Sequence, residues 1–305
     1  TNLIGNGTIT WTTPAGSGTP LQITNNPSFS YTNNTGSNAS VFAQVSMANN
    51  GYFTRLGGTW GGGQYLTTVI SNYTSTWGLG LNGTNPGVTS FNEAFKSCST
   101  LTAVPTQIPL TVKNIGSMFK DAIVFNSNDV ISWTTSNVTD MSNMFNGAAL
   151  FNQDLDTWDT SDVTDMSGMF NGSAVFNGDI TGWTTTNVTD MNSMFKTAIG
   201  FNQDIGGWTT SNVTDMSNMF NGAIVFNRDL DTWNTSAVTD MNNMFNGSSL
   251  FNGNIGTWTT SSVNDMNNMF NNAPSFNGDI TGWNTSSVTD MNSMFTAATG
   301  FNQAI

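Results

Sequence analysis

Aspartate recurs at a spacing of 25 residues over much of this chain, and it is the residue type best placed to do chemistry. The first set is Asp140, Asp165, Asp190, Asp215, Asp240, Asp265 and Asp290. If successive repeats stack at the ~4.8 Å spacing of paired strands, these carboxylates form a column of like charges that repel one another. Either each Asp caps its own turn by accepting a backbone N–H bond, or calcium ions lie between the repeats. Capping is favoured because the glycine-rich signature of calcium-binding coils is missing, and calcium is the only cofactor considered.

A second acidic column falls on a segment predicted to be extended, with its side chains outward. The positions beside it vary from repeat to repeat, and variation on a fixed scaffold is how repeat surfaces adapt to a ligand. A solvated face is the alternative interpretation. The predicted ligand-facing residues are Gln153, Asp154, Asp156, Asp179, Gln203, Asp204, Arg228, Asp229, Asp231 and Asp279.

Enzymatic chemistry is not expected. The chain has no His and a single Cys, Cys98, so Ser-His, Cys-His and His-metal sites are excluded. A hydrolase with paired carboxylates needs two different environments to separate two pKa values, whereas repeated columns provide identical ones.

Other repeated residues are interpreted as structural. Asn follows Phe in every repeat and predicts an asparagine ladder: Asn126, Asn152, Asn177, Asn202, Asn227, Asn252, Asn277 and Asn302. A Thr column is read as turn and strand filler, with a hydroxyl array for ice or sugar as the alternative: Thr135, Thr160, Thr185, Thr210, Thr235, Thr260 and Thr285. Seven Trp residues at the same period, from Trp133 to Trp283, are predicted to be core and not a glycan-stacking surface.

The repeat that positions these residues is one coil of a solenoid. Each coil carries Met-x-x-Met-Phe, as in Met141, Met144 and Phe145, which favours a short helical or 3₁₀ turn with one buried side. The FNQDLDTW segment, residues 151–158, is predicted to be a short extended stretch that pairs with the next coil.

The chain divides at residue 88. Residues 88–305 are predicted to form about nine coils, with 88–137 degenerate, 138–287 regular and 288–305 truncated without a polar capping coil. Residues 1–87 are rich in Thr, Asn, Gly and Ser, with alternating stretches and turn signals that predict an all-β domain.

Charge separates the same two parts. Residues 1–87 contain one charged side chain, Arg55, whereas residues 88–305 contain five basic and 19 acidic side chains, which gives a net charge of −14. An acidic surface repels phosphate backbones and anionic lipid heads, so binding to nucleic acid is not expected. No run of about 18 apolar residues predicts a membrane span, and no signal sequence is recognised at the start. The nearly uncharged residues 1–87 are expected to dock within a homo-oligomer or larger assembly.

The segment AFKSCSTLTAVP, residues 94–105, resembles the BspA-like leucine-rich-repeat unit. The NVTDMSNMF and FNQDLDTW units resemble the Met/Trp-rich variant of that family, found in bacterial and mycoplasmal surface proteins. The resemblance covers residues 88–305 and implies a leucine-rich-repeat-like solenoid on a surface, often credited with adhesion, with no catalytic residues to carry over.

Two functions are therefore expected. The first is a non-enzymatic protein on an extracellular, cell or virion surface, which recognises a protein or glycan of a host or cell surface through its acidic solenoid. The alternative is a decoration, fibre or sheath subunit of a virion or filament that docks through residues 1–87.

Overall fold

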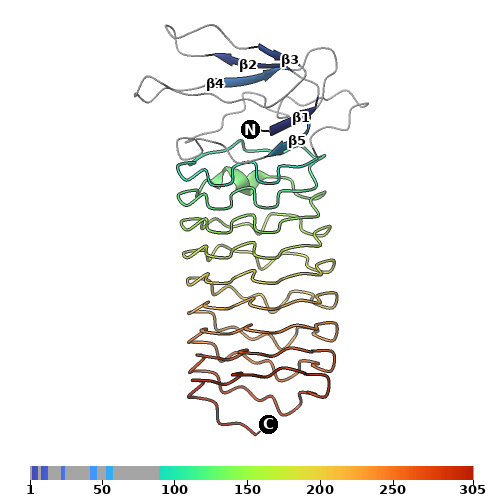
Figure 1. Cartoon of the computed structure of the whole chain (residues 1–305), viewed down its shortest axis with the longest axis vertical. Helices are drawn as coiled ribbons and strands as arrows, with labels where there is room; N and C mark the ends of the chain where they lie inside the picture. The colour runs from blue at the N-terminus through green and yellow to red at the C-terminus, as the bar shows by residue number, and fades with distance from the viewer. Residues whose placement is uncertain are drawn as a thin grey trace.

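The computed structural model describes five strands near the N-terminus and residues 89–304 (Figure 1). The strands are β1 (Asn2–Gly5), β2 (Thr8–Thr12), β3 (Gln22–Thr24), β4 (Phe42–Ser46) and β5 (Phe53–Gly57). β1 pairs with β5, and β2 lies between β3 and β4, all antiparallel. These strands fall within the predicted all-β segment, and the other residues of that segment, including its proposed docking face, lie outside the described part.

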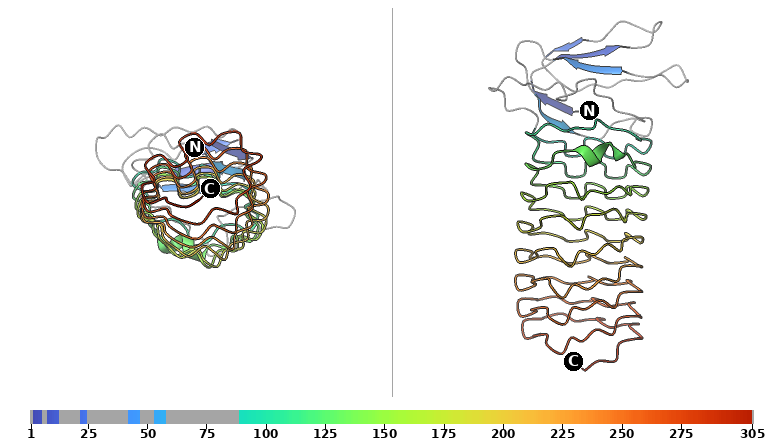
Figure 2. Two further views of the ribbon diagram at one scale, coloured as in Figure 1. Left: turned by 90° about the horizontal axis from the view of Figure 1, so that it is seen from below. Right: turned by 180° about the vertical axis from the view of Figure 1, so that it is seen from behind.

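Residues 89–304 run as successive coils, each lying on the one before it (Figure 1). Seen along the stack, the coils nearly superpose (Figure 2). Single parallel β-bridges join each coil to the next, from Ser90↔Asn114 and Asn114↔Asp140 through to Asp265↔Asp290. The bridges recur at the Asp column, so the acidic side chains are held at the point where neighbouring backbones pair.

The segment after the bridge is a chain of tight turns that also pairs with the next coil. Within one coil, the N–H groups of Met144, Asn146 and Ala148 each bond the carbonyl three residues earlier, at 2.9–3.2 Å. The intervening N–H groups, such as those of Asn143 and Phe145, bond carbonyls of the next coil at 2.7–2.9 Å. Alternate N–H groups thus serve the turn and the stack, which leaves few backbone donors unpaired.

This segment differs from the helical or 3₁₀ turn expected from the sequence. Two residues per coil, four apart, have left-handed backbones, as in Asn143 (φ 54°) and Gly147 (φ 73°) or Asn218 (φ 58°) and Gly222 (φ 72°). Each is the third residue of a hydrogen-bonded four-residue turn, the type II arrangement. A helix has no left-handed residue, so the Met and Phe residues are turned inward by β-turns instead.

The FNQDLDTW segment is not a strand in the structure. The residues around it are joined to neighbouring coils mainly by side chains, and backbone bonds to the next coil are those from Leu155 to Asp179 and from Leu230 to Asn254, at 2.8 and 2.9 Å. In the degenerate part of the array, the equivalent region contains the 3₁₀ helix η2 (Asn128–Ser132), which Ser127 caps. The backbone pairing expected at residues 151–158 therefore lies instead at the Asp column and the turns that follow it.

The core consists of stacked rings and methionines. Within each coil from that of Phe119 onward, two Phe rings lie 3.8–4.2 Å apart, as in Phe145 and Phe151. Trp rings of neighbouring coils stack at 6.1–6.4 Å from Trp133 to Trp208 and from Trp233 to Trp283. Each indole N–H donates to a carbonyl of the preceding coil, as Trp183 does to Leu155 at 2.7 Å. Trp133–Trp258 are buried, which confirms that these indoles are core, and Trp283 in the last full coil is partly exposed.

Candidate functional site

The Asp column lies beside the bridges, half-buried except for the exposed Asp290. In each coil one carboxylate oxygen accepts the backbone N–H two residues later, at 2.7–2.9 Å. Asn114 does the same one coil earlier, with its amide oxygen 2.9 Å from the nitrogen of Gly116. The column therefore has the geometry of turn capping, and an amide performs the role as well as a carboxylate.

Stacking makes this column electrostatically unfavourable. Burial raises the pKa of Asp190 and of Asp240, and the like charges of the Asp residues above and below raise it further, against the lowering effect of the turn hydrogen bonds. The one ion pair among the described residues, Lys96 with Glu93, lies elsewhere. At Asp190 and Asp240 the turn hydrogen bond therefore favours the ionised carboxylate, whereas burial and the neighbouring charges oppose it.

Calcium binding to this column stays a prediction. No group of three or more acidic or Cys side chains in the described coils is arranged to hold a metal ion. Each carboxylate from Asp165 to Asp265 lies between like groups one coil above and one below, and one of its oxygens is already engaged in the turn bond.

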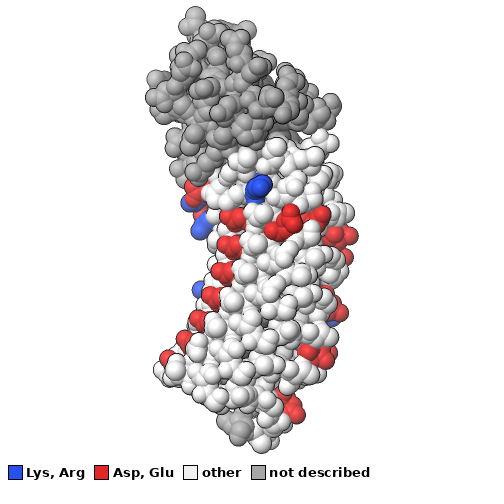
Figure 3. Space-filling model, turned by 90° about the vertical axis from the view of Figure 1, so that its right-hand side faces the viewer, with Lys and Arg blue, Asp and Glu red and all other residues white. Residues whose placement is uncertain are grey.

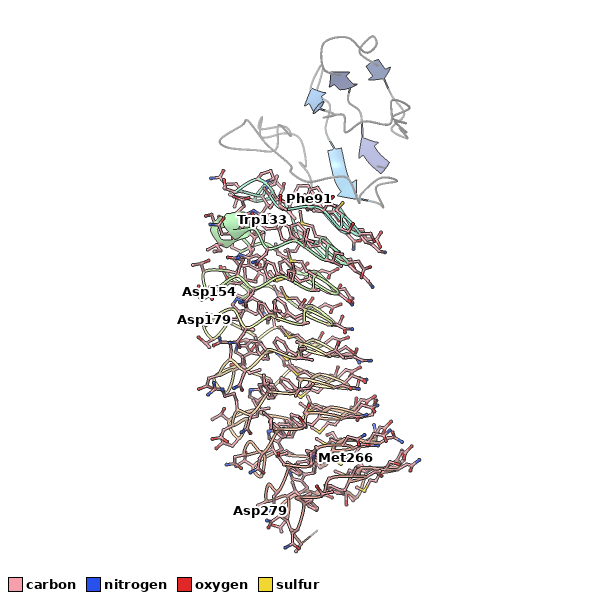
Figure 4. The ribbon with its side chains drawn as sticks, turned by 90° about the vertical axis from the view of Figure 1, so that its left-hand side faces the viewer. Phe91, Trp133, Asp154, Asp179, Met266 and Asp279 are labelled. Atoms are coloured by element: carbon pink, nitrogen blue, oxygen red, sulfur yellow. The ribbon has the colours of Figure 1, made fainter. Side chains whose placement is uncertain are left out.

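A second set of carboxylates forms what we call the acidic corner: Asp154, Asp156, Asp179, Asp204, Asp229, Asp231 and Asp279. Asp154, Asp179 and Asp279 lie along one outer edge of the stack (Figure 4). Figure 3, which views the opposite side of the molecule, shows acidic side chains along both outlines of the stack. All seven members of the corner are exposed or half-exposed, so the structure brings the predicted acidic residues onto one accessible edge.

Most members of the acidic corner are used locally. Asp154 and Asp229 accept the backbone N–H of the next coil at 2.9 and 2.8 Å. Asp179 and Asp279 accept both the backbone N–H and the hydroxyl of Thr181 and Thr281, and these bonds lower the pKa of each carboxyl.

Two members are different. The carboxylates of Asp156 and Asp231 accept no hydrogen bond from the described residues. They are the acidic-corner groups with all their acceptor capacity free for a ligand.

The neighbouring variable column is structural in part. Gln153, Gln203 and Arg228 each donate to the backbone carbonyl of an Asn in the preceding coil, at 2.6–3.0 Å. They therefore lie along the asparagine ladder, in which each amide oxygen accepts the backbone N–H of the next Asn at 2.7–3.0 Å.

Steric packing explains two of the glycines in that column. A Cβ on Gly178 would lie 2.0 Å from the Gln153 carbonyl oxygen, and one on Gly253 would lie 2.0 Å from that of Arg228. Gln153 is followed one coil later by Gly178, and Arg228 by Gly253, because a side chain at either Gly would collide with the backbone of the preceding coil. This variation is therefore not by itself evidence that the column selects a ligand.

The hydroxyl-array interpretation of the Thr column is wrong. Six of its members, from Thr135 to Thr260, are buried, and each hydroxyl donates to a backbone carbonyl of the next coil at 2.8–3.0 Å. These Thr hydroxyls hydrogen-bond neighbouring coils to one another, and because they are buried they cannot contact ice or a sugar.

One surface feature was missed from the sequence, and we call it the aliphatic stripe: Ile123, Leu150, Val175, Ile199, Ile224 and Leu250. Each side chain is 43–51% exposed, and each lies one or two residues before the Phe of the Phe-Asn pair in six successive coils. The signal was present in the sequence, because in each of these six coils an aliphatic residue stands one or two positions before the Phe that points into the core.

Cys98 and the helices add no further site. The Cys98 thiol is buried, and burial raises its pKa to about 12, which keeps it protonated and unreactive. Among the described residues, no helix has the length and apolar character needed to cross a bilayer.

Comparison with known proteins identifies the repeats. Searches of curated proteins and of solved structures gave no match. One family matches three overlapping segments, residues 89–207, 113–232 and 224–305, which together cover the whole stack of coils. The chain therefore belongs to the family described as Mycoplasma protein of unknown function, DUF285.

Proposed function

We propose that this chain is a non-enzymatic recognition protein that binds its ligand through the acidic corner. The observation that carries the proposal is the contrast between two kinds of repeated polar residue. Asn and Thr columns are bonded to neighbouring coils, whereas the exposed Asp156 and half-exposed Asp231 have carboxylates that accept no hydrogen bond from the described part of the chain. Side chains that build the stack are thus separable from side chains left for a partner.

The charge of the corner selects the class of ligand. The described coils carry 19 acidic side chains and few basic ones, and the one ion pair there leaves the corner uncompensated. A cationic or neutral ligand, such as a basic protein segment or a glycan on a cell surface, fits this potential, whereas an anionic polymer is repelled.

The architecture proposed for this role is a leucine-rich-repeat-like solenoid. Bridges at each Asp of the column and stacked Trp and Phe ladders support it. The resemblance to BspA-like surface proteins and the match to a mycoplasmal family support a location on an extracellular, cell or virion surface, where such a rod projects its corner toward a partner.

A structural subunit of a virion or filament is the second candidate. The aliphatic stripe favours it, because exposed aliphatic side chains in six successive coils are typical of an association surface. Docking through residues 1–87 belongs to this candidate and lies outside the described residues.

The test uses the full chain and two charge-matched double variants. Asp156→Asn with Asp231→Asn removes two free carboxylates from the corner, and Asp121→Asn with Asp162→Asn removes two exposed carboxylates elsewhere. On an array of basic peptides and cell-surface glycans, the corner variant is expected to lose its ligand and the control to retain it. Equal binding by both variants, or no binding by the wild type, would contradict the proposal.

A further inference from the structure

The aliphatic stripe is bounded at both ends. In the coil before it, the equivalent positions are Ser99 and Thr100, and in the two coils after it they are Pro274 with Ser275 and Thr299 with Gly300. Its six side chains therefore form a patch in the middle of the stack and are not a general filler of this turn. A contiguous apolar patch of limited extent is typical of an interaction surface, whereas apolar side chains on an ordinary solvated surface are scattered singly.

Mostly uncharged positions flank the stripe. On one side lies the asparagine ladder, and on the other a left-handed position that is Asp121 in the first coil of the stripe and is uncharged in the other five, as Gly147, Gly172, Thr197, Gly222 and Gly247. An apolar ridge with mostly neutral borders is a strip of the described coils along which two strongly negative molecules can approach closely.

The stripe is also staggered in a regular way. In three coils the exposed aliphatic lies two residues before the Phe, as Ile123, Ile199 and Ile224, and in three it lies one residue before, as Leu150, Val175 and Leu250. Along the chain, the distance from the aliphatic residue to the Phe runs two, one, one, two, two, one. When the six coils are taken in reverse order, every two is replaced by a one and every one by a two.

This pattern interlocks with an antiparallel copy of itself. In an antiparallel pair, the first of the six coils lies opposite the sixth of the other copy, the second opposite the fifth, and the third opposite the fourth. Four aliphatic side chains then face small residues of the other copy: Ile199 faces Ala174, Val175 faces Gly200, Ile224 faces Ala149 and Ile123 faces Ser249. The other two aliphatic side chains, Leu150 and Leu250, face the half-buried Val225 and Val124. Four of the six protruding side chains therefore meet small residues, which is the knob-and-gap relation that close packing needs.

We propose that the aliphatic stripe is the contact between two copies of this chain lying side by side and antiparallel. Six half-exposed aliphatic side chains offer roughly 500 Å² per copy, and the flanking Asn and Gly positions bring this toward the roughly 800 Å² per partner of a standard interface. A two-fold axis between the coils of Val175 and Ile199 makes the contact self-complementary and closed, so this contact alone pairs two copies, and a longer assembly would need a second one.

The dimer uses different residues from the acidic corner, so each proposal can fail without the other. Ligand binding is read on the array with corner variants, and self-association is read on the unliganded protein with stripe variants.

The first experiment is sedimentation velocity of the full chain over a dilution series. The wild type is expected to show a monomer–dimer equilibrium, and Ile199→Asp is expected to weaken it about tenfold or more, because each contact then buries an unpaired carboxylate twice. Thr209→Asp is the control: it adds the same charge at an exposed position in the column where Asp159 already stands. A wild type that stays monomeric to about 100 µM, where an interface of this size should form, overturns the proposal.

The second experiment fixes the orientation by disulfide trapping. Copies carrying Ala174→Cys are mixed with copies carrying Ile199→Cys, and the native Cys98 is fully buried and so does not compete. Efficient formation of the mixed disulfide dimer supports the antiparallel contact. Cross-linking no greater than that between Ala174→Cys and Ser249→Cys copies, whose cysteines lie in coils that do not face one another, overturns it.

Discussion

Replacing Asp190 with Asn should stabilise the protein at neutral pH. The amide oxygen of Asn can accept the turn N–H of Asn192, the bond that the Asp190 carboxylate makes at 2.8 Å, as Asn114 does for Gly116 in the same column. The substitution therefore keeps the capping geometry while removing one charge from the middle of the ladder.

The size of the effect follows from the two neighbouring carboxylates, Asp165 and Asp215. At the ~5 Å spacing of bridged coils and the high effective dielectric of a half-exposed site, each repulsion amounts to about 1 kcal/mol before salt screening. Relief of both, reduced by screening, gives about 1–2 kcal/mol, which for the described coils corresponds to a rise of about 2–8 °C in Tm.

The gain should vanish at low pH. Because burial and like charges raise the pKa of Asp190 in the folded chain above its unfolded value, the folded state favours the protonated form. The wild type is therefore penalised above that raised pKa, and the penalty disappears as the pH falls through it. Asn cannot titrate, so the difference in stability between variant and wild type should shrink toward zero over the same range.

Thermal unfolding at pH 7 and at acidic pH, each in low and high salt, measures both effects. Asp162→Asn is the control, since it removes the same charge from an exposed position off the ladder. A destabilised Asp190→Asn, a gain that persists when carboxylates are protonated, or an equal gain in Asp162→Asn would refute the reasoning.

Three further expectations test other parts of the structure. Thr197 has a left-handed backbone (φ 53°) in a column that is otherwise often Gly, so Thr197→Gly should stabilise the chain by about 1 kcal/mol in thermal unfolding, whereas Gly172→Ala should destabilise it by a similar amount. Trp183→Phe removes the indole bond to the Leu155 carbonyl and core volume, and should cost about 1–3 kcal/mol in urea unfolding, with an unchanged Tm as the contrary result. If calcium occupies the Asp column, millimolar calcium should raise Tm beyond the effect of magnesium at equal ionic strength, and Asp215→Asn should reduce that increment.

The sequence predicted the core more completely than the backbone. Trp, Met and Phe at a spacing of 25 identified the buried ladders, because large apolar side chains that recur once per coil are removed from water when equivalent residues of successive coils stack on one another. The interruption by η2 (Asn128–Ser132) was not foreseen, since one extra residue before Trp133 is a weak local signal.

Backbone pairing was misplaced because spacing alone does not distinguish a helical turn from consecutive β-turns. Met141, Met144 and Phe145 satisfy either one. The deciding signal was the pair of left-handed positions, such as Asn143 and Gly147, whose residue types tolerate positive φ.

The candidate site was predicted in outline and not in detail. The acidic side chains were expected to face outward, and they are exposed or half-exposed, but which of their carboxylates remain unbonded depends on contacts with the adjacent coil. Asp154 and Asp156 look alike in sequence, yet one accepts the N–H of Asp179 and the other accepts none from the described residues. Likewise Thr135 and Thr139 are the same residue type in one coil, but the side chain of Thr135 is buried and that of Thr139 is only half-buried.

The most direct test of recognition by the acidic corner is the affinity of the full chain for the strongest ligand found on the array. Surface plasmon resonance should show that Asp156→Asn with Asp231→Asn weakens binding about tenfold or more, while Asp121→Asn with Asp162→Asn leaves it within about twofold. Equal affinities for wild type and both variants would contradict the assignment of recognition to this surface.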